Sequence, residues 1–297
     1  MVYIYPKLSK NNFFFLRRCS TGLGNLLFCW ARSIVFASKH NLKILSPIWF
    51  QLTLGPFIRF EKDKRSYFDL FKSHPDEIKY FSKFSILLKA KKITEGEFLK
   101  NIEFYKNSHN SYVVSYTEMG DFNSIENDSK IISNYLKIIT KNKHKRGLDF
   151  NFENSISIHV RKGDFLSTNQ STPDDFFINI IAAIRNYIGH EIKVYIFSDA
   201  TASECANLLA GINNSERITF NSSVADILAL SQSNILIASK NSTFSWWAGF
   251  IGQMPVVWPN GTKIKINSKK NTKEVIIENF ESLPVFFKNE LQSRFKQ

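Results

Sequence analysis

The sequence predicts an α/β fold made of two Rossmann-like halves. Two observations support this prediction. From residue 154 onward, short apolar stretches typical of strands alternate with stretches of helical spacing, as in a parallel sheet covered by helices on both faces. Near the N-terminus, an apolar stretch, a glycine-containing turn and a helical stretch follow one another, as in half of a nucleotide-binding βαβ unit.

In the N-terminal half, residues 13–16 are expected to form a short strand, residues 26–39 a helix and residues 42–45 a second strand. The range 50–150 is less regular and rich in Lys, Phe and Asn, and we expect it to be mostly helical.

The C-terminal half alternates more clearly. Strands are expected at residues 155–160, 193–197, 217–220, 235–238 and 256–258, and helices at 173–187, 202–210, 224–231 and 243–251. Ligands of such sheets bind beyond the carboxyl ends of the strands, so residues that follow the strands are candidates for a site.

The basic stretch 140–147 ends in glycine and is typical of an interdomain linker. We therefore expect two domains, residues 1–150 and residues 151–297, the second ending in a helix.

The composition indicates a globular, basic protein. The 297 residues include 39 Lys and Arg against 26 Asp and Glu, a net charge of +13. Such a charge suits an anionic partner, although scattered lysines also fit plain solvated faces. The three cysteines fit neither a disulfide framework nor a zinc site, so a reducing cytoplasm is expected. No signal peptide or transmembrane run is visible, which leaves peripheral contact with an anionic membrane open.

The segment from His159 to Asp164 follows the clearest predicted strand. Strand alternation places His159 and Arg161 on one face, where a guanidinium can bind a pyrophosphate bidentately and stabilise a departing phosphate. Asp164 is expected to orient Arg161 or His159. The same spacing also fits a surface Arg–Asp pair beside a buried histidine.

Two further segments precede predicted helices. Ser223 and Asp226 fit a capping box, and Asp226 could also accept hydrogen bonds from a guanine edge. Ser242 or Thr243 suits the cap of the next helix, where hydroxyl and N–H groups would face a phosphate. An ordinary cap explains both segments equally well.

Gly22, Gly24 and Asn25 lie between the first predicted strand and its helix. Glycines there allow the backbone to approach a phosphate, yet the third glycine of the dinucleotide fingerprint is missing. A tight structural turn is the alternative interpretation.

No Asp-x-Asp sequence follows a predicted strand, and no His, Cys or carboxylate cluster has metal-ligand spacing. Asp174 and Asp175 are better explained as stabilising a helix start. We therefore expect no metal and no cofactor, with Arg161, Lys162 and helix N-termini in the place of a cation.

Taken together, the candidate segments resemble those of the bacterial α-1,2-fucosyltransferases of glycosyltransferase family 11, and they follow one another in the family's order. The matching features are Gly22-x-Gly24-Asn25-x-Leu27-Phe28, Gly120-x-Phe122-x-Ser124, His159-x-Arg161-x-Gly163-Asp164, Ser198-Asp199, and Asp226 followed by Asn241-Ser242-Thr243-Phe244-Ser245-Trp246-Trp247. They are also similar to the wider superfamily of α-1,6- and protein O-fucosyltransferases.

The resemblance implies a GT-B-type fold with two Rossmann-like domains facing across a cleft. It implies inverting, metal-independent transfer of fucose from GDP-L-fucose to the 2-hydroxyl of a galactose-containing glycan or lipid-linked oligosaccharide, in O-antigen or other surface-polysaccharide assembly at the inner face of the cell membrane. Nucleic acid is not an expected partner.

Carried onto this sequence, the resemblance gives each candidate residue a role. Arg161 binds the β-phosphate, and His159 and Asp226 hold the nucleoside. The substrate cleft is lined by Gly22, Gly24, Asn25, Asp199, Ser242 and Thr243.

The sequence departs from the family pattern at Leu26, at Lys162 and in residues 120–124, which puts the acceptor in doubt more than the donor. Asp164 is the first candidate for the general base, with Asp121 and Glu118 as others. One alternative is a transferase that uses another GDP-sugar donor. The other is a basic nucleic-acid-binding protein, and the diffuse distribution of the positive charge argues against it.

Overall fold

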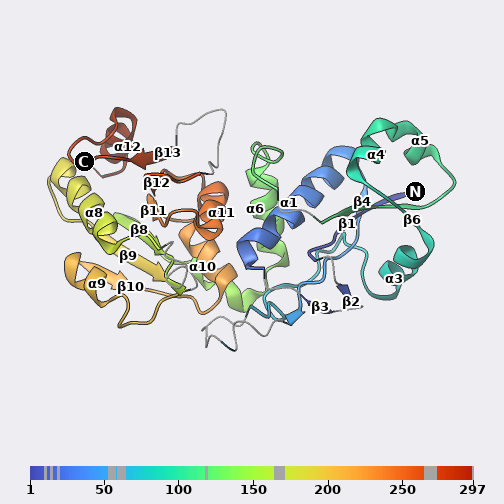
Figure 1. Ribbon diagram of the computed structural model, residues 1–297, viewed down its shortest axis with the longest axis horizontal. Helices are drawn as coiled ribbons and strands as arrows, with labels where there is room; N and C mark the ends of the chain where they lie inside the picture. Colours follow the sequence, from blue (N-terminus) through green and yellow to red (C-terminus); the bar gives the residue numbers. More distant parts are fainter. Residues whose placement is uncertain are drawn as a thin grey trace. The chain divides into compact units, whose positions relative to one another are not determined.

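The computed structural model describes residues 1–9, 12–13, 16–18, 21–52, 58, 65–117, 120–163, 171–263 and 273–295. The chain separates into two compact units, unit 1 (Met1–Lys141) and unit 2 (Asn142–Gln297). Figure 1 colours unit 1 from blue to green and unit 2 from green to red. Both are α/β units built on parallel sheets. Within the described residues, no helix is long and apolar enough to cross a membrane.

Unit 1 is built on a four-stranded parallel sheet. Its strands, in spatial order, are β4 (Lys43–Ile44), β1 (Val2–Pro6), β7 (Tyr112–Tyr116) and β6 (Lys91–Ile93). Helix α1 (Leu23–His40) connects β1 to β4 and buries most of its side chains. It ends at Asn41, whose left-handed backbone lets its N–H reach the carbonyls of Ala37 and Ser38.

The first strand of this βαβ unit is β1, not the expected strand at residues 13–16. β2 (Asn12–Phe13) and β3 (Leu16–Arg18) instead pair antiparallel, and β3 joins β5 (Gln51–Leu52) in a separate small sheet. Phe14 and Phe15 lie outside the described residues. β1 could not be recognised as a strand from the sequence, because it is buried along almost its whole length and does not alternate between polar and apolar residues.

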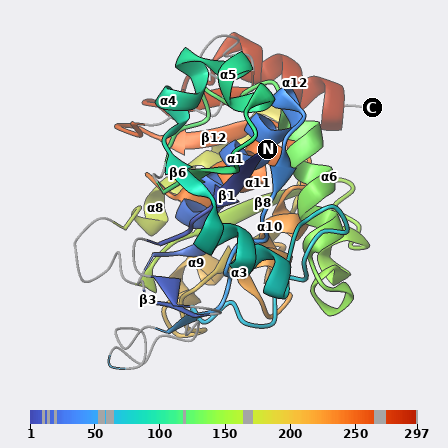
Figure 2. The same cartoon turned by 90° about the vertical axis from the view of Figure 1, so that its right-hand side faces the viewer.

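The range 50–150 is less helical than expected. It contains α3 (Tyr80–Lys89), α4 (Glu95–Lys100), α5 (Ile102–Asn107) and α6 (Ser129–Ile139). The expectation misses β6 and β7, however, and β7 is an interior strand of the sheet. Figure 2 shows α3, β6, α4 and α5 along one side of unit 1.

Unit 2 is a Rossmann-like domain. Its six parallel strands run in the order β10 (Ser215–Arg217), β9 (Lys193–Ser198), β8 (Ser155–Val160), β11 (Leu236–Ala238), β12 (Val256–Pro259) and β13 (Glu274–Ile277). Numbered along the chain, this is the order 3-2-1-4-5-6 of dinucleotide-binding domains. The alternation predicted from the sequence is confirmed, except that β10 begins earlier than expected and β13 was missed.

The helices of unit 2 are α8 (Asp174–Ile188), α9 (Ala206–Gly211), α10 (Ser223–Leu230), α11 (Thr243–Gly252) and α12 (Val285–Phe295). Two short 3-10 turns, η1 (Asn142–His144) and η2 (Arg146–Leu148), precede them.

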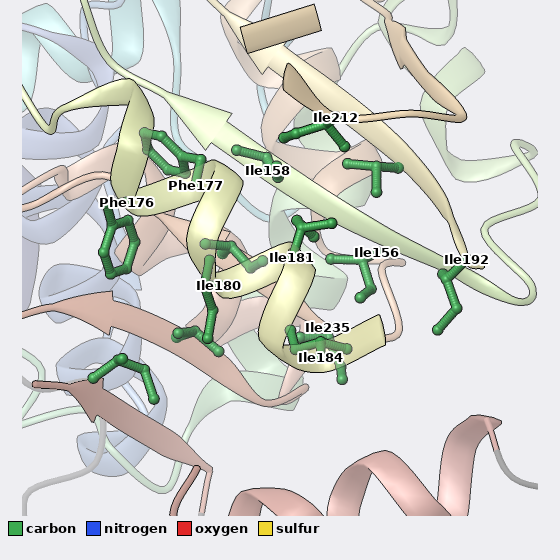
Figure 3. Packing of buried hydrophobic residues seen from close by; sticks show 14 of the residues in the cluster. Ile156, Ile158, Phe176, Phe177, Ile180, Ile181, Ile184, Ile192, Ile212 and Ile235 are labelled. Carbon is green, nitrogen blue, oxygen red and sulfur yellow. The ribbon is translucent and has the colours of Figure 1, made fainter. Parts of the chain in front are cut away.

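The apolar core of unit 2 lies between α8 and the sheet. Phe177, Ile180 and Ile184 of α8 pack with Ile156 and Ile158 of β8, as Figure 3 shows. The spacing of these helical residues places them on one face, and burial of such side chains is worth roughly 1.5–3 kcal/mol each. This core fixes β8 in the middle of the sheet, and β8 leads directly into the candidate site.

Candidate active site

The carboxyl end of β8 lies where the strand order of the unit 2 sheet reverses. β8 pairs with β9 on one side and with β11 on the other. The chain continues to α8 after β8 and to α11 after β11. Ligands of open α/β sheets bind at such a switch point, so the residues that follow β8 and β11 form the candidate site of unit 2.

Strand alternation sorts the side chains of β8 between the two faces of the sheet. Ile158 and Val160 belong to the core under α8, whereas His159 contacts the side chain of Ser245 in α11. His159 thus lies on the opposite face of the sheet from Ile158 and Val160.

His159 is enclosed between β8 and the start of α11, with 5% of its surface exposed. Its Nδ1 lies 2.7 Å from Ser245 Oγ, and its ring stacks on Phe244 with the centroids 4.7 Å apart. Burial, reinforced by the positive charge of Arg161, lowers the pKa of His159 to about 3. A neutral imidazole in this position ties α11 to β8, and its expected contact with a nucleotide stays a prediction.

The side chain of Arg161 is held by a carboxylate that follows the neighbouring strand. Arg161 Nη1 lies 2.5 Å from Asp199 Oδ2, and both side chains are partly exposed. The other oxygen, Asp199 Oδ1, accepts the backbone N–H of Lys162 at 2.9 Å. The guanidinium is thus oriented in advance, and such a group can bind a phosphate through two parallel N–H bonds. The partner expected from the sequence, Asp164, lies outside the described residues.

Ser239, which follows β11, joins the two strand ends at the switch point. Its hydroxyl accepts the backbone N–H of Arg161 at 2.8 Å and donates to the carbonyl of His159 at 2.9 Å. The side chain is fully buried. Sequence reasoning missed this residue, although a small polar residue directly after a buried apolar strand was the available signal.

Lys162 does not occupy the cationic position that we expected for it. Its ammonium donates to Asp174 Oδ2 at 2.8 Å and to the carbonyl of Glu204 at 2.7 Å, and its side chain is buried. Strand alternation explains this, because Lys162 points to the opposite face from Arg161. Asp174 does begin α8, as expected, and it also pairs with this lysine.

Ser242 caps helix α11, as expected. Its Oγ accepts the backbone N–H of Ser245 at 3.4 Å, and the side chain is buried. Thr243 is the first helical residue and is partly exposed, so it lies at the helix end where N–H groups favour an anion. Trp246 and Trp247 are both buried in the core.

The predicted capping box at Ser223 is wrong by one residue. The cap of α10 is Ser222, whose backbone is extended and whose Oγ accepts the N–H of Ala225 at 3.3 Å. Asp226 is therefore the fourth helical residue. Its carboxylate accepts the backbone N–H of Phe220 at 2.6 Å and the hydroxyl of Thr219 at 3.3 Å. Asp226 thus closes the turn before α10, and a contact with guanine stays a prediction.

In unit 1, Gly22 is the N-cap of α1. No side chain caps this helix, and its first turn contains no acidic residue. The carbonyl of Gly22 accepts the N–H of Asn25 at 3.1 Å and that of Leu26 at 3.3 Å. A Cβ added at Gly22 would have no atom within 4 Å, and φ is −67°. Neither backbone conformation nor packing within the described residues requires glycine here, whereas close approach of a ligand would require it.

Among the alternative bases, Asp121 is exposed and accepts the backbone N–H of Asn123 at 3.0 Å. Glu118 lies outside the described residues. Across the part of the chain that the structure describes, no three His, Cys, Asp or Glu side chains form a cluster that could hold a metal ion.

A family model supplies the decisive comparison. The model of glycosyl transferase family 11 matches residues 15–273, which is most of the chain and includes both candidate regions. The chain belongs to glycosyltransferase family 11. The resemblance to this family is confirmed, and so is the expectation that the chain is a glycosyltransferase. A search among curated proteins finds no match for this glycosyltransferase.

Among solved structures, two fucosyltransferases have a similar fold. NodZ α-1,6-fucosyltransferase from Bradyrhizobium, soaked with GDP-fucose, is 12% identical with a TM-score of 0.50, and the match covers 88% of this chain and 96% of NodZ. POFUT1 in complex with GDP is 12% identical with a TM-score of 0.52, and the match covers 86% and 97% of the two chains. At this identity the likeness concerns the fold, and the family 11 glycosyltransferase has a GT-B-type α/β fold.

Proposed function

We propose that this glycosyltransferase transfers L-fucose from GDP-L-fucose to the 2-hydroxyl of a galactoside acceptor, with inversion and without a metal ion. The observation that carries the proposal is the position of Arg161, a guanidinium pre-oriented by Asp199 at the switch point of a Rossmann-like sheet. The GDP and GDP-fucose complexes of proteins with this fold support the choice of donor.

In this reaction the bond between the anomeric carbon and the β-phosphate oxygen breaks while an acceptor hydroxyl attacks from the opposite side. Negative charge develops on the departing GDP. Arg161 would bind the β-phosphate and stabilise that charge, a contribution of roughly 3–4 kcal/mol for one well-placed donor. Asp199 keeps the guanidinium in place, so little reorganisation is needed in the transition state.

The other candidate residues keep the roles that the family resemblance implies. The start of α11, with Ser242 and Thr243, would hold phosphate oxygens, and Asp226 would accept hydrogen bonds from guanine. The start of α1 would offer a second anion site through Gly22 and the residues Gly24 and Asn25. Residues 151–297 would be the GDP-sugar-binding domain, and residues 1–150 would form the acceptor side, with the start of α1 as their one contribution to the pyrophosphate.

A general base that accepts the proton of the acceptor hydroxyl would add about 10²–10⁴-fold to the rate. Asp164 is our first choice, because it follows the Arg161 segment in the sequence. Asp121 and Glu118 are the alternatives on the acceptor side.

The acceptor that we propose is a galactose-containing glycan or a lipid-linked oligosaccharide in the assembly of a surface polysaccharide such as O-antigen. The basic charge of the chain suits catalysis at the inner face of the cell membrane.

Calorimetry and product analysis test the proposal. GDP and GDP-fucose should bind, and UDP should bind at least tenfold more weakly, because its base lacks the groups that Asp226 would contact. Incubation with GDP-fucose and a panel of β-galactosides should give a product whose NMR spectrum shows fucose on O2 of galactose. If the enzyme turns over GDP-mannose in preference to GDP-fucose, the proposed donor is wrong. Equal affinity for UDP and GDP would contradict the proposed recognition of guanine.

A further inference from the structure

Helix α3 turns a lysine inward and three large side chains, Tyr80, Phe81 and Leu88, outward. Lys83 is 5% exposed, whereas Phe81 is 90%, Leu88 85% and Tyr80 72% exposed. A solvated surface helix has the opposite arrangement, with apolar residues on the core side and lysines in water.

Contacts on the inner side fix this orientation. The ammonium of Lys83 lies 5.0 Å from the centroid of the Tyr5 ring, and the buried carboxylate of Glu77 exerts an attractive Coulomb interaction on it. Ile86 and Leu87 pack against a cluster of the unit 1 sheet that includes Tyr5. Because these residues lie on one side of α3, the opposite side must carry Phe81 and Leu88 outward.

Two of the outward residues share one side of the helix. Phe81 and Leu88 are two helical turns apart on the same side of α3, and Tyr80 is adjacent to Phe81. We call Tyr80, Phe81 and Leu88 the α3 face. Isolated exposed apolar residues are common, whereas large apolar side chains that gather on one side of a helix suit contact with a partner.

The sequence that carries the α3 face is rich in lysine. Residues 79–94 contain five lysines and no acidic residue. Four of these lysines are exposed, namely Lys79, Lys89, Lys91 and Lys92. Lys91 and Lys92 belong to β6, the edge strand of the sheet, which lies next to α3 in Figure 2. An apolar face bordered by positive charge is complementary to an anionic, partly apolar surface.

We propose that the α3 face docks on an anionic lipid bilayer. Phe81 and Leu88 would enter the boundary between headgroups and acyl chains, Tyr80 would lie at headgroup depth, and the four lysines would contact lipid phosphates. A second copy of the chain is a poorer partner, because two such faces would bring lysines against lysines. Peripheral docking of this kind needs no membrane-spanning helix.

Co-sedimentation with vesicles tests the proposal on the full chain. The protein should sediment with vesicles that contain roughly one third phosphatidylserine and much less with pure phosphatidylcholine, and salt should release it. The Phe81→Ser/Leu88→Ser variant should bind roughly tenfold more weakly, because it loses two apolar side chains from the contact. The Lys91→Gln/Lys92→Gln variant should lose about fivefold for each lysine.

Two matched variants control for lost hydrophobicity and lost charge. Ile131→Ser/Ile138→Ser removes two apolar residues of α6 that are 44% and 42% exposed, and Lys130→Gln/Lys263→Gln removes two exposed lysines elsewhere. Neither should reduce sedimentation to the same extent. Circular dichroism should show that all variants are folded.

Three outcomes would overturn the proposal. The first is no binding to the anionic vesicles, and the second is binding that the α3 variants retain. The third is a wild-type dimer, seen by sedimentation velocity, that the Phe81→Ser/Leu88→Ser variant abolishes in the absence of lipid, because the face would then join two copies of the chain.

Discussion

Arg161 Nη1 lies 2.5 Å from Asp199 Oδ2, and the second oxygen of the same carboxylate accepts the backbone N–H of Lys162 at 2.9 Å. One carboxylate therefore fixes both the guanidinium and the backbone from which it extends. Hydrogen-bond donors that are oriented before the reaction stabilise developing charge without a free-energy cost for reorienting them in the transition state. This relationship makes Arg161 the residue on which activity should depend most.

Replacing Arg161 with alanine should lower kcat by about 10²–10³, because the proposed donor to the departing phosphate is lost. Arg161→Lys should recover only part of the activity, since an ammonium keeps the charge without the bidentate geometry. Steady-state kinetics with GDP-fucose would measure both effects, and thermal melting would show that the proteins fold. Near-normal turnover by a folded Arg161→Ala protein would contradict the assignment.

Asp199→Asn should reduce kcat roughly tenfold, which is less than the loss in Arg161→Ala. The amide oxygen can still accept the N–H of Lys162, but the charge that holds Arg161 is gone. If Asp199 acts only through Arg161, the double variant should be no slower than Arg161→Ala alone. Additive losses in that double-mutant cycle would mean that Asp199 contacts the substrate itself.

Gly163→Ala should lower activity by disturbing the same ion pair. A Cβ at position 163 would collide with the carboxylate of Asp199, so the carboxylate must shift, which would disturb its pairing with Arg161. Gly96→Ala is the matched control, because a Cβ there meets nothing within 4 Å. We expect a several-fold loss of kcat for Gly163→Ala alone. Equal kinetics for the two variants would show that Asp199 adjusts without consequence for catalysis.

Much of unit 2 could be predicted from the sequence, because its strands and helices have clear periodicity. The alternation of Ile156, Ile158 and Val160 with His159 gave both the strand and the face on which the site lies. The strand order itself could not be predicted, since parallel pairing depends on contacts that are distant in the sequence.

The partners of the site residues were harder to predict than the residues themselves. Asp199 was expected to bind substrate, and nothing local shows that it faces Arg161 across two neighbouring strands. Lys162 follows Arg161 in sequence, yet it points to the opposite side toward Asp174. In unit 1, β1 and β7 were missed because buried interior strands lack the polar alternation that identifies half-exposed ones.

Gly22→Ala should leave the folded state intact and weaken donor binding. Its φ of −67° suits alanine, and an added Cβ has no neighbour within 4 Å, so the melting temperature should be unchanged or slightly higher. If a phosphate approaches the start of α1, the methyl group would obstruct it and raise KM for GDP-fucose several-fold. The Gly96→Ala protein again supplies the control. An unchanged KM would remove the start of α1 from the donor site.

The buried imidazole of His159 should make the stability of the protein depend on pH. The unfolded chain protonates this histidine near pH 6.5, whereas burial and Arg161 keep it neutral in the folded protein down to about pH 3. Between these values the unfolded state binds the proton preferentially. The contribution of His159 is therefore complete above pH 6.5 and is lost as the pH falls toward 3.

A non-titrating variant isolates this effect from the other ionisable groups. His159→Gln keeps a side chain that can hydrogen-bond to Ser245 but cannot take up a proton. Urea unfolding of both proteins at about pH 7.5 and about pH 4.5 should show that the wild type loses roughly 2–3 kcal/mol more than the variant, since each pH unit below 6.5 costs about 1.4 kcal/mol. If both proteins lose the same amount, His159 accepts a proton in the folded state, and the imidazole is then not confined between Ser245 and Phe244.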